Sequence, residues 1–236
     1  MQPIPVMETA FDTAAGSRVF IAKVYMWMAI GLFITAAVSI APFIVLGEDT
    51  YTELLYENIY IFYGLLLFEV LLVFGLTAMI HKIPAIVGIL VFMFYSLLNG
   101  ITLSPIFIVY TGASIFSTFA VCAIMFGGTS ILGFITKIDL TRFGGFLTMA
   151  LFGLIGAMFV NMFLHSDRMS WIISFIGVIL FVGLTAYDTQ KIKNMSGYVD
   201  NSSEEGQKAS IMGALALYLD FINLFLFLLR LLGKRR

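Results

Sequence analysis

The fold is decided by residues 209–232, which read ASIMGALALYLDFINLFLFLLRLL. A helix needs about 20 mostly apolar residues to cross a bilayer, so this stretch is long enough. It carries a carboxylate, Asp220, near its middle, and such a group must face protein, water or an ion rather than lipid. At helical spacing one face is small and polar, as in contacts between membrane helices: Ser210, Gly213, Leu217, Asp220 and Leu224. We therefore expect a central helix that the other spans surround.

The composition indicates a polytopic membrane protein. The chain has 236 residues, of which 61% are hydrophobic and 11% charged, whereas soluble domains have about 45–50% apolar and about 25% charged residues. The net charge of −1 gives no case for nucleic acid as a partner. The single cysteine, Cys122, cannot form an internal disulfide, and no Cys/His zinc pattern is present, so we expect no cofactor.

Seven stretches are predicted to be membrane-spanning helices, which gives an all-α bundle: residues 20–46, 59–80, 83–109, 114–136, 143–164, 171–189 and 209–232. We expect residues 1–19 to be a loose N-terminal segment, residues 20–232 to form the transmembrane domain, and residues 233–236 to be a basic tail. The acidic connection Gly47–Asn58 is interpreted as a solvated outer loop.

The distribution of Lys and Arg predicts a cytoplasmic N-terminus. With that orientation, only Arg168 lies in an outer loop. Eight basic residues lie in the inner segments: Arg18, Lys23, Lys82, Lys137, Arg142, Lys191, Lys193 and Lys208. The basic residues from Arg230 onward would lie outside if the last span crosses fully, which we expect from its apolar length.

Three acids lie inside the predicted spans, namely Glu69, Asp188 and Asp220, and no Lys or Arg lies deep in a span to neutralise them. Such carboxylates must share protons, bind a cation or contact water. This pattern favours a role in transport or proton coupling over acids that merely join helices. All three are candidate Ca²⁺ ligands, because calcium prefers oxygen.

The depths of two of these acids can be compared along their helices. Asp188 is expected about 5 Å from the inner edge and Asp220 about 16 Å deep, at about 1.5 Å per residue. A kink, a loop that dips inward or a later start of the last span would bring them level. Two carboxyl groups that meet titrate as a unit. They could alternate between a hydrogen-bonded closed form and a separated, charged form that suits Ca²⁺.

The other polar residues of interest lie on the second predicted span. Glu69 is in its middle and suits a further proton or cation site along a path; the alternative is a protonated acid bonded to a neighbouring helix. His81 and Lys82 end this span on the same side as Asp188. Either could pair with Asp188, or both could be ordinary interfacial anchors.

Three motifs, together with the seven spans, resemble the transmembrane Bax inhibitor motif (Bax inhibitor-1) family: GITLSPI at residues 100–106, YDTQKI at residues 187–192 and LALYLDFINLF at residues 215–225. The likeness covers residues 20–232, and the last motif is the most specific. The short termini are similar to those of bacterial members, which implies the bacterial inner (plasma) membrane.

The resemblance implies a seven-helix bundle with the last helix at its centre and, rather than an enzyme, a pH-sensitive calcium leak channel. The sensor of the family is an aspartate pair that matches Asp188 and Asp220, and a glutamate of its pore matches Glu69. The family pattern also has an Arg latch at the end of helix two. This position is Ile80 here, followed by His81 and Lys82. Either His81 or Lys82 takes over the latch, or the latch is absent.

Two other functions compete with the channel. An intramembrane aspartyl protease also has aspartates in adjacent spans, but it requires Gly-x-Gly-Asp, whereas Leu217, Tyr218 and Leu219 precede Asp220 here. A membrane interaction protein without a pore is the stronger alternative. The resemblance implies such roles in stress response, in cell death or beside a membrane protease. The expected partners of the channel are Ca²⁺, protons and the lipid bilayer.

Overall fold

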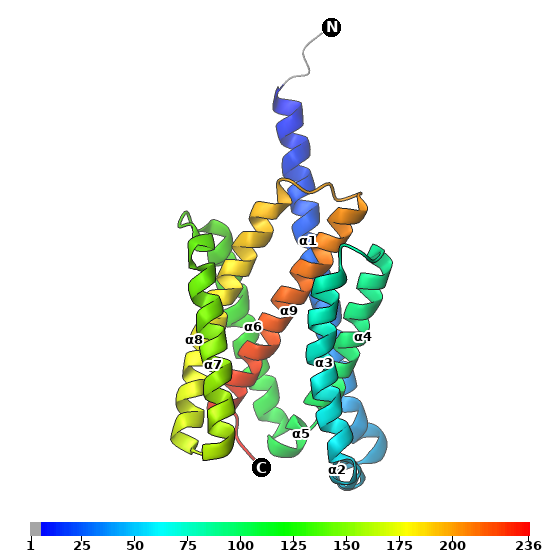
Figure 1. Ribbon diagram of the computed structural model, residues 1–236, viewed down its shortest axis with the longest axis vertical. Helices are drawn as coiled ribbons and strands as arrows, with labels where there is room; N and C mark the ends of the chain where they lie inside the picture. Colours follow the sequence, from blue (N-terminus) through cyan, green and yellow to red (C-terminus); the bar gives the residue numbers. More distant parts are fainter. Residues whose placement is uncertain (1–5) are drawn as a thin grey trace. The chain divides into compact units, whose positions relative to one another are not determined.

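The computed structural model describes residues 6–236, with side chains from residue 16 onward, and nearly all of this part of the chain is helical (Figure 1). Its elements are α1 (Val6–Leu46), α2 (Glu48–Glu57), α3 (Ile59–Met79), α4 (Ala85–Leu103), α5 (Ile106–Val109), α6 (Gly112–Ile135), η1 (Leu140–Phe143), α7 (Gly144–Leu164), α8 (Asp167–Ser196) and α9 (Glu204–Leu232). The β-type pairing within residues 6–236 is limited to one bridge, between Tyr110 and Arg235.

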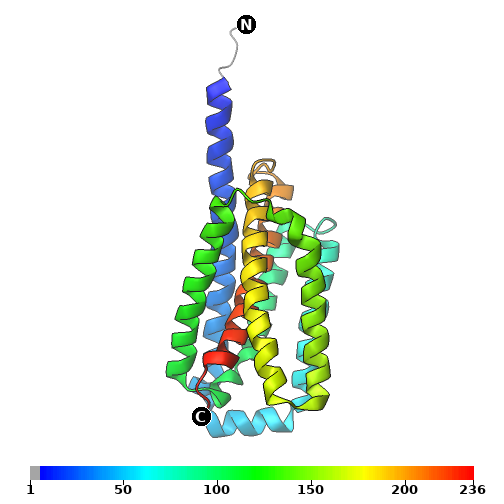
Figure 2. The same cartoon turned by 90° about the vertical axis from the view of Figure 1, so that its left-hand side faces the viewer.

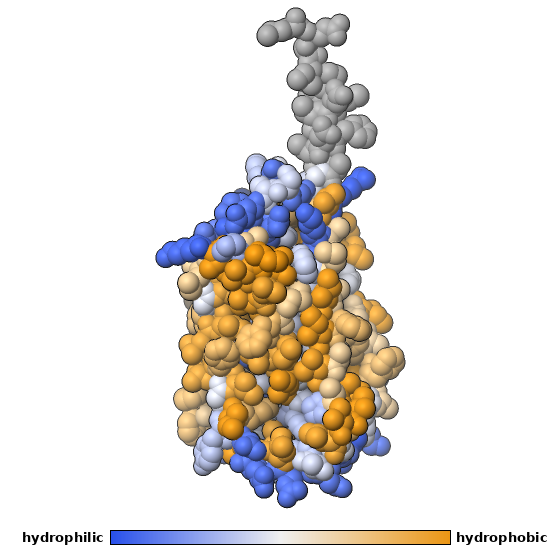
Figure 3. Space-filling model, turned by 90° about the vertical axis from the view of Figure 1, so that its right-hand side faces the viewer, coloured by the Kyte–Doolittle hydropathy of each residue, from blue (hydrophilic) through white to orange (hydrophobic). Residues whose placement is uncertain are grey.

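Seven segments are long and apolar enough to cross a membrane, which confirms the predicted number of spans. The segments lie at Gly16–Leu46, Ile59–Met79, Ala85–Val109, Gly112–Ile135, Leu140–Leu164, Asp167–Ser196 and Glu204–Leu232. The face seen in Figure 3 has hydrophobic side chains over its middle and hydrophilic ones at its ends. This distribution is expected where hydrocarbon contacts the middle of the helices and water their ends.

Helix α9 is the most buried of the seven, because 72% of its most apolar window is buried, compared with 44% for the span Ala85–Val109 and less for the others. Its side chains on the face predicted to point inward are fully enclosed, among them Leu217 and Leu224. Asp220 is only 5% exposed. The small and polar face of α9 therefore packs against protein, as the sequence predicted.

The chain divides into two compact units, and α9 contributes to both. The first comprises the chain up to Val109 together with residues 195–215, and the second comprises residues 110–194 and 216–236. In the first unit, α4 packs against α1 and α3. The contact with α1 is close because Gly100 lacks a side chain; a Cβ there would lie 2.8 Å from the carbonyl oxygen of Thr35. In the second unit, α7 and α8 run antiparallel beside each other (Figure 2).

Two predictions about the segments outside the spans are corrected. Helix α1 begins at Val6, so residues 6–19 are helical rather than loose, while residues 1–5 lie outside the described part. The connection between the first two spans is helix α2 rather than a loop. Its acids Glu48 and Asp49 lie in the first turn, where carboxylates stabilise the positive end of the helix dipole. The basic tail is hydrogen bonded to α6, since the backbone N–H of Lys234 donates to Ser114 Oγ at 2.8 Å.

Helix α2 is attached to the rest of its unit by one buried tyrosine. Tyr51 is 6% exposed, and its hydroxyl is hydrogen bonded to Ser104 Oγ at 2.5 Å. Its ring packs on Phe43, which also contacts Phe107. Ser104 lies at the break between α4 and α5, where Pro105 cannot continue the hydrogen-bond pattern of the helix. The third span is therefore interrupted at this point, and α2 docks against the break.

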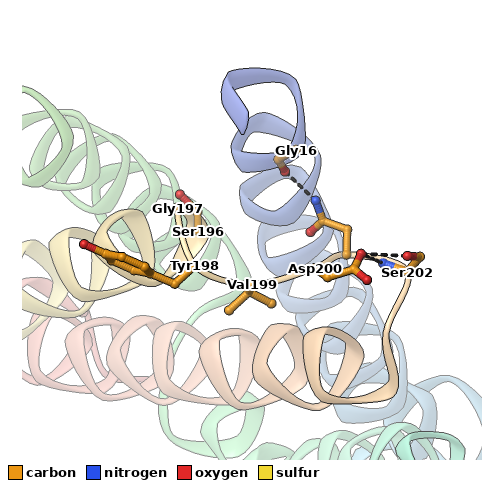
Figure 4. Close-up of a pocket in the computed structure, with 8 residues that line it drawn as sticks. Gly16, Ser196, Gly197, Tyr198, Val199, Asp200 and Ser202 are labelled. Atoms are coloured by element: carbon orange, nitrogen blue, oxygen red, sulfur yellow. Dashed lines mark hydrogen bonds between the residues drawn. The ribbon is translucent and has the colours of Figure 1, made fainter. Parts of the chain in front are cut away.

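The connection between α8 and α9 is tied to α1 by hydrogen bonds (Figure 4). Asn201 Nδ2 donates to the carbonyl of Gly16 at 2.6 Å, and Lys23 Nζ donates to the carbonyl of Asn201 at 3.0 Å. A cavity of about 470 Å³ lies beside this connection, lined by Gly16 and residues 196–202. Asp200 accepts hydrogen bonds from the backbone and hydroxyl of Ser202, which lowers the pKa of its carboxyl.

Replacing Asn201 with alanine is expected to loosen this connection, because it removes the side-chain bond to Gly16. A buried hydrogen bond contributes about 1 kcal/mol, so local opening should increase about fivefold. Tyr198 is 93% exposed and offers chymotrypsin a cleavage site in the connection. The measurement is the rate of cleavage after Tyr198 in detergent. Ser202→Ala is the control, since it affects only a bond within the loop; equal rates in the two variants would contradict the prediction.

Candidate functional site

Asp188 and Asp220 meet in the second unit, where their carboxyl groups lie within reach of a hydrogen bond to each other. Such a bond requires a proton on one of the two groups, because an ionised carboxylate only accepts hydrogen bonds. The sequence expected Asp188 near the end of its helix. Helix α8 instead continues to Ser196, which places Asp188 about 12 Å inside it at about 1.5 Å per residue.

The orientation of α8 is fixed by the residues around Asp188. Thr189 is fully buried and donates from its hydroxyl to Ser130 on α6. The side chain of Gln190 bridges the connection before α7: its Nε2 donates to the carbonyl of Ile138, and its Oε1 accepts from the backbone of Leu140. Lys191 is close enough to attract Asp188 electrostatically. The YDTQK segment therefore holds α8 in the rotation that directs Asp188 toward α9.

The aspartate pair lines a cavity of about 380 Å³ formed by α7, α8 and α9. Most of its lining is apolar: Leu151, Leu154, Ile155, Met158, Phe181, Leu184, Ala216, Leu219 and Phe227. The polar lining residues are Asp188, Asp220 and Asn223. Asp220 Oδ2 is buried and has no hydrogen-bond partner. The cavity thus combines apolar walls with a buried pair of carboxyl groups.

Glu69 lies in the first unit and is bonded to α4. Its side chain is 6% exposed. Thr102 Oγ1 donates to Glu69 Oε1 at 2.8 Å, and Asn99 Nδ2 donates to Glu69 Oε2 at 3.2 Å. Both donors lie in the last turn before α4 breaks. The structure therefore shows the hydrogen bonds to a neighbouring helix that the sequence offered as one interpretation of Glu69.

His81 and Lys82 lie in the exposed turn between α3 and α4. His81 Nδ1 is 3.5 Å from Glu205 Oε2, near the start of α9. The backbone of Ala85 donates to Glu204 Oε1, and Lys208 forms ion pairs with both glutamates. These contacts attach the turn to α9, and a latch between this turn and Asp188 stays a prediction.

A resident metal site is not formed by the described residues, which contain no cluster of three or more His, Cys, Asp or Glu side chains able to hold an ion. Calcium takes six to eight oxygen ligands, and the pair supplies two carboxyl groups.

One polar contributor to these sites was not singled out from the sequence. Thr102 shares a helix face with Asn99, three residues away, so the spacing contained a signal for a joint partner of a buried acid. Asn223 follows Asp220 by three residues, and its position beside the pair was readable from the same spacing. The apolar wall that α7 contributes carries no comparable signal, because any lipid-facing helix has the same composition.

The chain is similar to known proteins over nearly all of its length. Residues 17–236 match the model of the protein family described as Inhibitor of apoptosis-promoting Bax1. An Escherichia coli relative, named inner membrane protein YbhL, is 48% identical over 237 residues, covering 100% of both chains. A Borreliella burgdorferi protein is 41% identical over 217 residues, or 92% of each chain. A Streptococcus pyogenes membrane protein is 37% identical over 223 residues, covering 93% of this chain and 94% of the relative.

Proposed function

Because the chain belongs to the Bax inhibitor-1 family, we propose that it is a membrane channel that leaks Ca²⁺ down its gradient under proton control, with Asp188 and Asp220 as the gate. The observation that supports this function is the hydrogen-bonded carboxyl pair beside a cavity within the membrane-spanning helices. The name of the Escherichia coli relative supports a location in the bacterial inner membrane.

The shared proton is the switch in this proposal. While it is present, α8 and α9 are joined through Asp188 and Asp220. Once it leaves, two negative charges face each other at hydrogen-bond distance in a poorly solvated site, where their repulsion is much stronger than in water. The carboxylates then separate, and their free oxygens become available to a passing cation. The hydrogen-bonded arrangement corresponds to the closed form.

Glu69 is proposed as a further carboxylate on the ion path. Its two oxygens are occupied by Thr102 and Asn99, which are neutral donors and can exchange for water or an ion without leaving a buried charge behind. The proximity of these donors to the break of α4 favours such an exchange, because the freed carbonyl groups of a broken helix can contact water inside a protein.

The test is Ca²⁺ flux into dye-loaded liposomes that contain the purified protein. Flux through the wild type is expected to change as the pH is varied from about 6 to about 8, because the paired carboxyl groups gain and lose their protons as a unit. Asp188→Asn and Asp220→Asn should each flatten this dependence, since an amide cannot titrate. The control is Asp139→Asn, which alters an exposed carboxylate near η1, outside the cavity.

Other outcomes would reject either the aspartate gate or the channel itself. Flux that both variants leave pH-dependent would retain the channel and reject the aspartate gate, making Glu69 and His81 the next residues to change. Well-folded protein that passes no Ca²⁺ at any pH, yet co-purifies with one membrane protein such as a protease, would support the interaction function instead.

A further inference from the structure

The cavity beside the aspartate pair has an unusual distribution of polarity. Its walls are side chains of Leu, Ile, Met, Phe and Ala, and its polar lining consists of Asp188, Asp220 and Asn223. None of the lining residues is basic. Both carboxyl groups of the pair line this space, and Asp220 is only 5% exposed. The side chain of Asn223 is held in place, because its Nδ2 donates to the carbonyl of Leu219 at 2.8 Å.

These features define the chemistry of an occupant. It must donate a hydrogen bond to the carboxyl pair, because the carboxyl oxygens that do not carry the shared proton are acceptors. It should carry a positive charge, because a pair that shares one proton keeps one negative charge and Lys191, which attracts Asp188, lies outside the lining. The rest of the occupant must be apolar to match the walls. Water meets only the first requirement, and a resident metal ion would lack oxygen ligands on the apolar side.

We propose that this cavity binds small amphiphilic amines, with the ammonium group on Asp220 and the apolar tail along α7. The volume of about 380 Å³ lies within the range of small-molecule sites. Helix α7 is the least buried of the seven spans, with 6% of its window buried, and Ile155 of the cavity wall is 47% exposed. An amine dissolved in the hydrocarbon therefore reaches the cavity past α7. This inference rests on the geometry of the cavity and not on calcium transport.

The test compares octylamine, octanol and octanoate, which share the same tail and differ in the head group. Each is titrated into the purified full-length protein in an uncharged detergent, and binding is followed by the midpoint of thermal unfolding and by saturation-transfer NMR. Octylamine should bind saturably, octanol more weakly and octanoate not at all, because the carboxyl pair repels it. Asp220→Asn should weaken octylamine binding about tenfold or more, as expected for loss of a charge-assisted hydrogen bond.

Two further variants keep the test decisive. Asp139→Asn removes an exposed carboxylate outside the cavity and should bind like the wild type. Ala216→Leu fills the cavity while both aspartates remain, and it should abolish binding even if Asp220→Asn fails to fold. If octylamine changed the unfolding midpoint and the NMR signal equally in all variants, it would be partitioning into micelles, and the proposal would be overturned. Equal binding of octanol and octylamine would also overturn it. The assay contains no calcium gradient, so its result is independent of whether the protein conducts.

Discussion

Replacing Gly133 with valine is expected to prevent α6 and α8 from packing and to remove most of the folded protein. A Cβ at this glycine would lie 2.6 Å from the carbonyl oxygen of Ala186 and 3.1 Å from its Cα. Both are backbone atoms, so no side chain can rotate away and α8 itself must move. Forced overpacking lowers the free energy of unfolding by about 1–3 kcal/mol and sometimes more. Because the clash is with backbone atoms, we expect a loss at the upper end of this range.

The same helix provides a matched control for Gly133→Val. Gly128 is also in α6, and a Cβ there would have no atom within 4 Å. Gly128→Val carries the same small gain in helix propensity without the clash. We expect a normal yield of monodisperse protein and a nearly unchanged unfolding temperature for Gly128→Val, and a large drop in both for Gly133→Val. Equal behaviour would mean that α6 and α8 do not need this close approach.

The position of Ala186 connects this packing to the aspartate pair. Asp188 follows Ala186 by two residues on α8, so a displacement of α8 at Ala186 also displaces the carboxyl group. Any Gly133→Val protein that survives purification is therefore expected to lose the pH dependence of flux, although both aspartates are intact.

Removing the hydroxyl donor of Glu69 is the second change with a large expected effect. Thr102→Val keeps the shape of the side chain but leaves Glu69 Oε1 without its 2.8 Å hydrogen bond. An unsatisfied buried polar group costs about 1–3 kcal/mol, and more when it is charged. The unfolding temperature should fall accordingly, because Glu69 is 6% exposed and has little access to water.

A double-mutant cycle isolates this interaction. In a Glu69→Met background, Thr102→Val should have almost no effect, because the apolar side chain needs no donor. Thr129→Val is the control for the loss of a buried hydroxyl alone, since Thr129 bonds only to the carbonyl of Met125 in its own helix. A cost of Thr102→Val that is the same with and without Glu69 would show that the two side chains act independently.

Much of the fold was readable from the sequence because the bilayer imposes local rules. Hydrocarbon requires long apolar helices, which gave the seven spans. A carboxylate is unfavourable in contact with lipid. Asp220 was therefore expected to point inward, with α9 enclosed by protein, and both are observed. The break at Pro105 followed from the missing backbone donor of proline. The helical N-terminal region and α2 were missed, since polar segments beyond the hydrocarbon are not subject to these rules.

The tertiary structure alone decided which of the polar residues meet. The sequence offered Asp188 and Asp220 as a pair only on condition of a kink, a loop that dips inward or a shifted helix, and the structure brings the two side chains together in the second unit. It could not predict that Glu69 bonds to Thr102, that His81 lies beside Glu205, or that α7 closes an apolar cavity. The rotation and axial register of a membrane helix depend on close contacts between residues distant in sequence, such as Gly133 with Ala186. Hydrophobicity determines that a helix crosses the membrane, and packing determines which side chains it brings together.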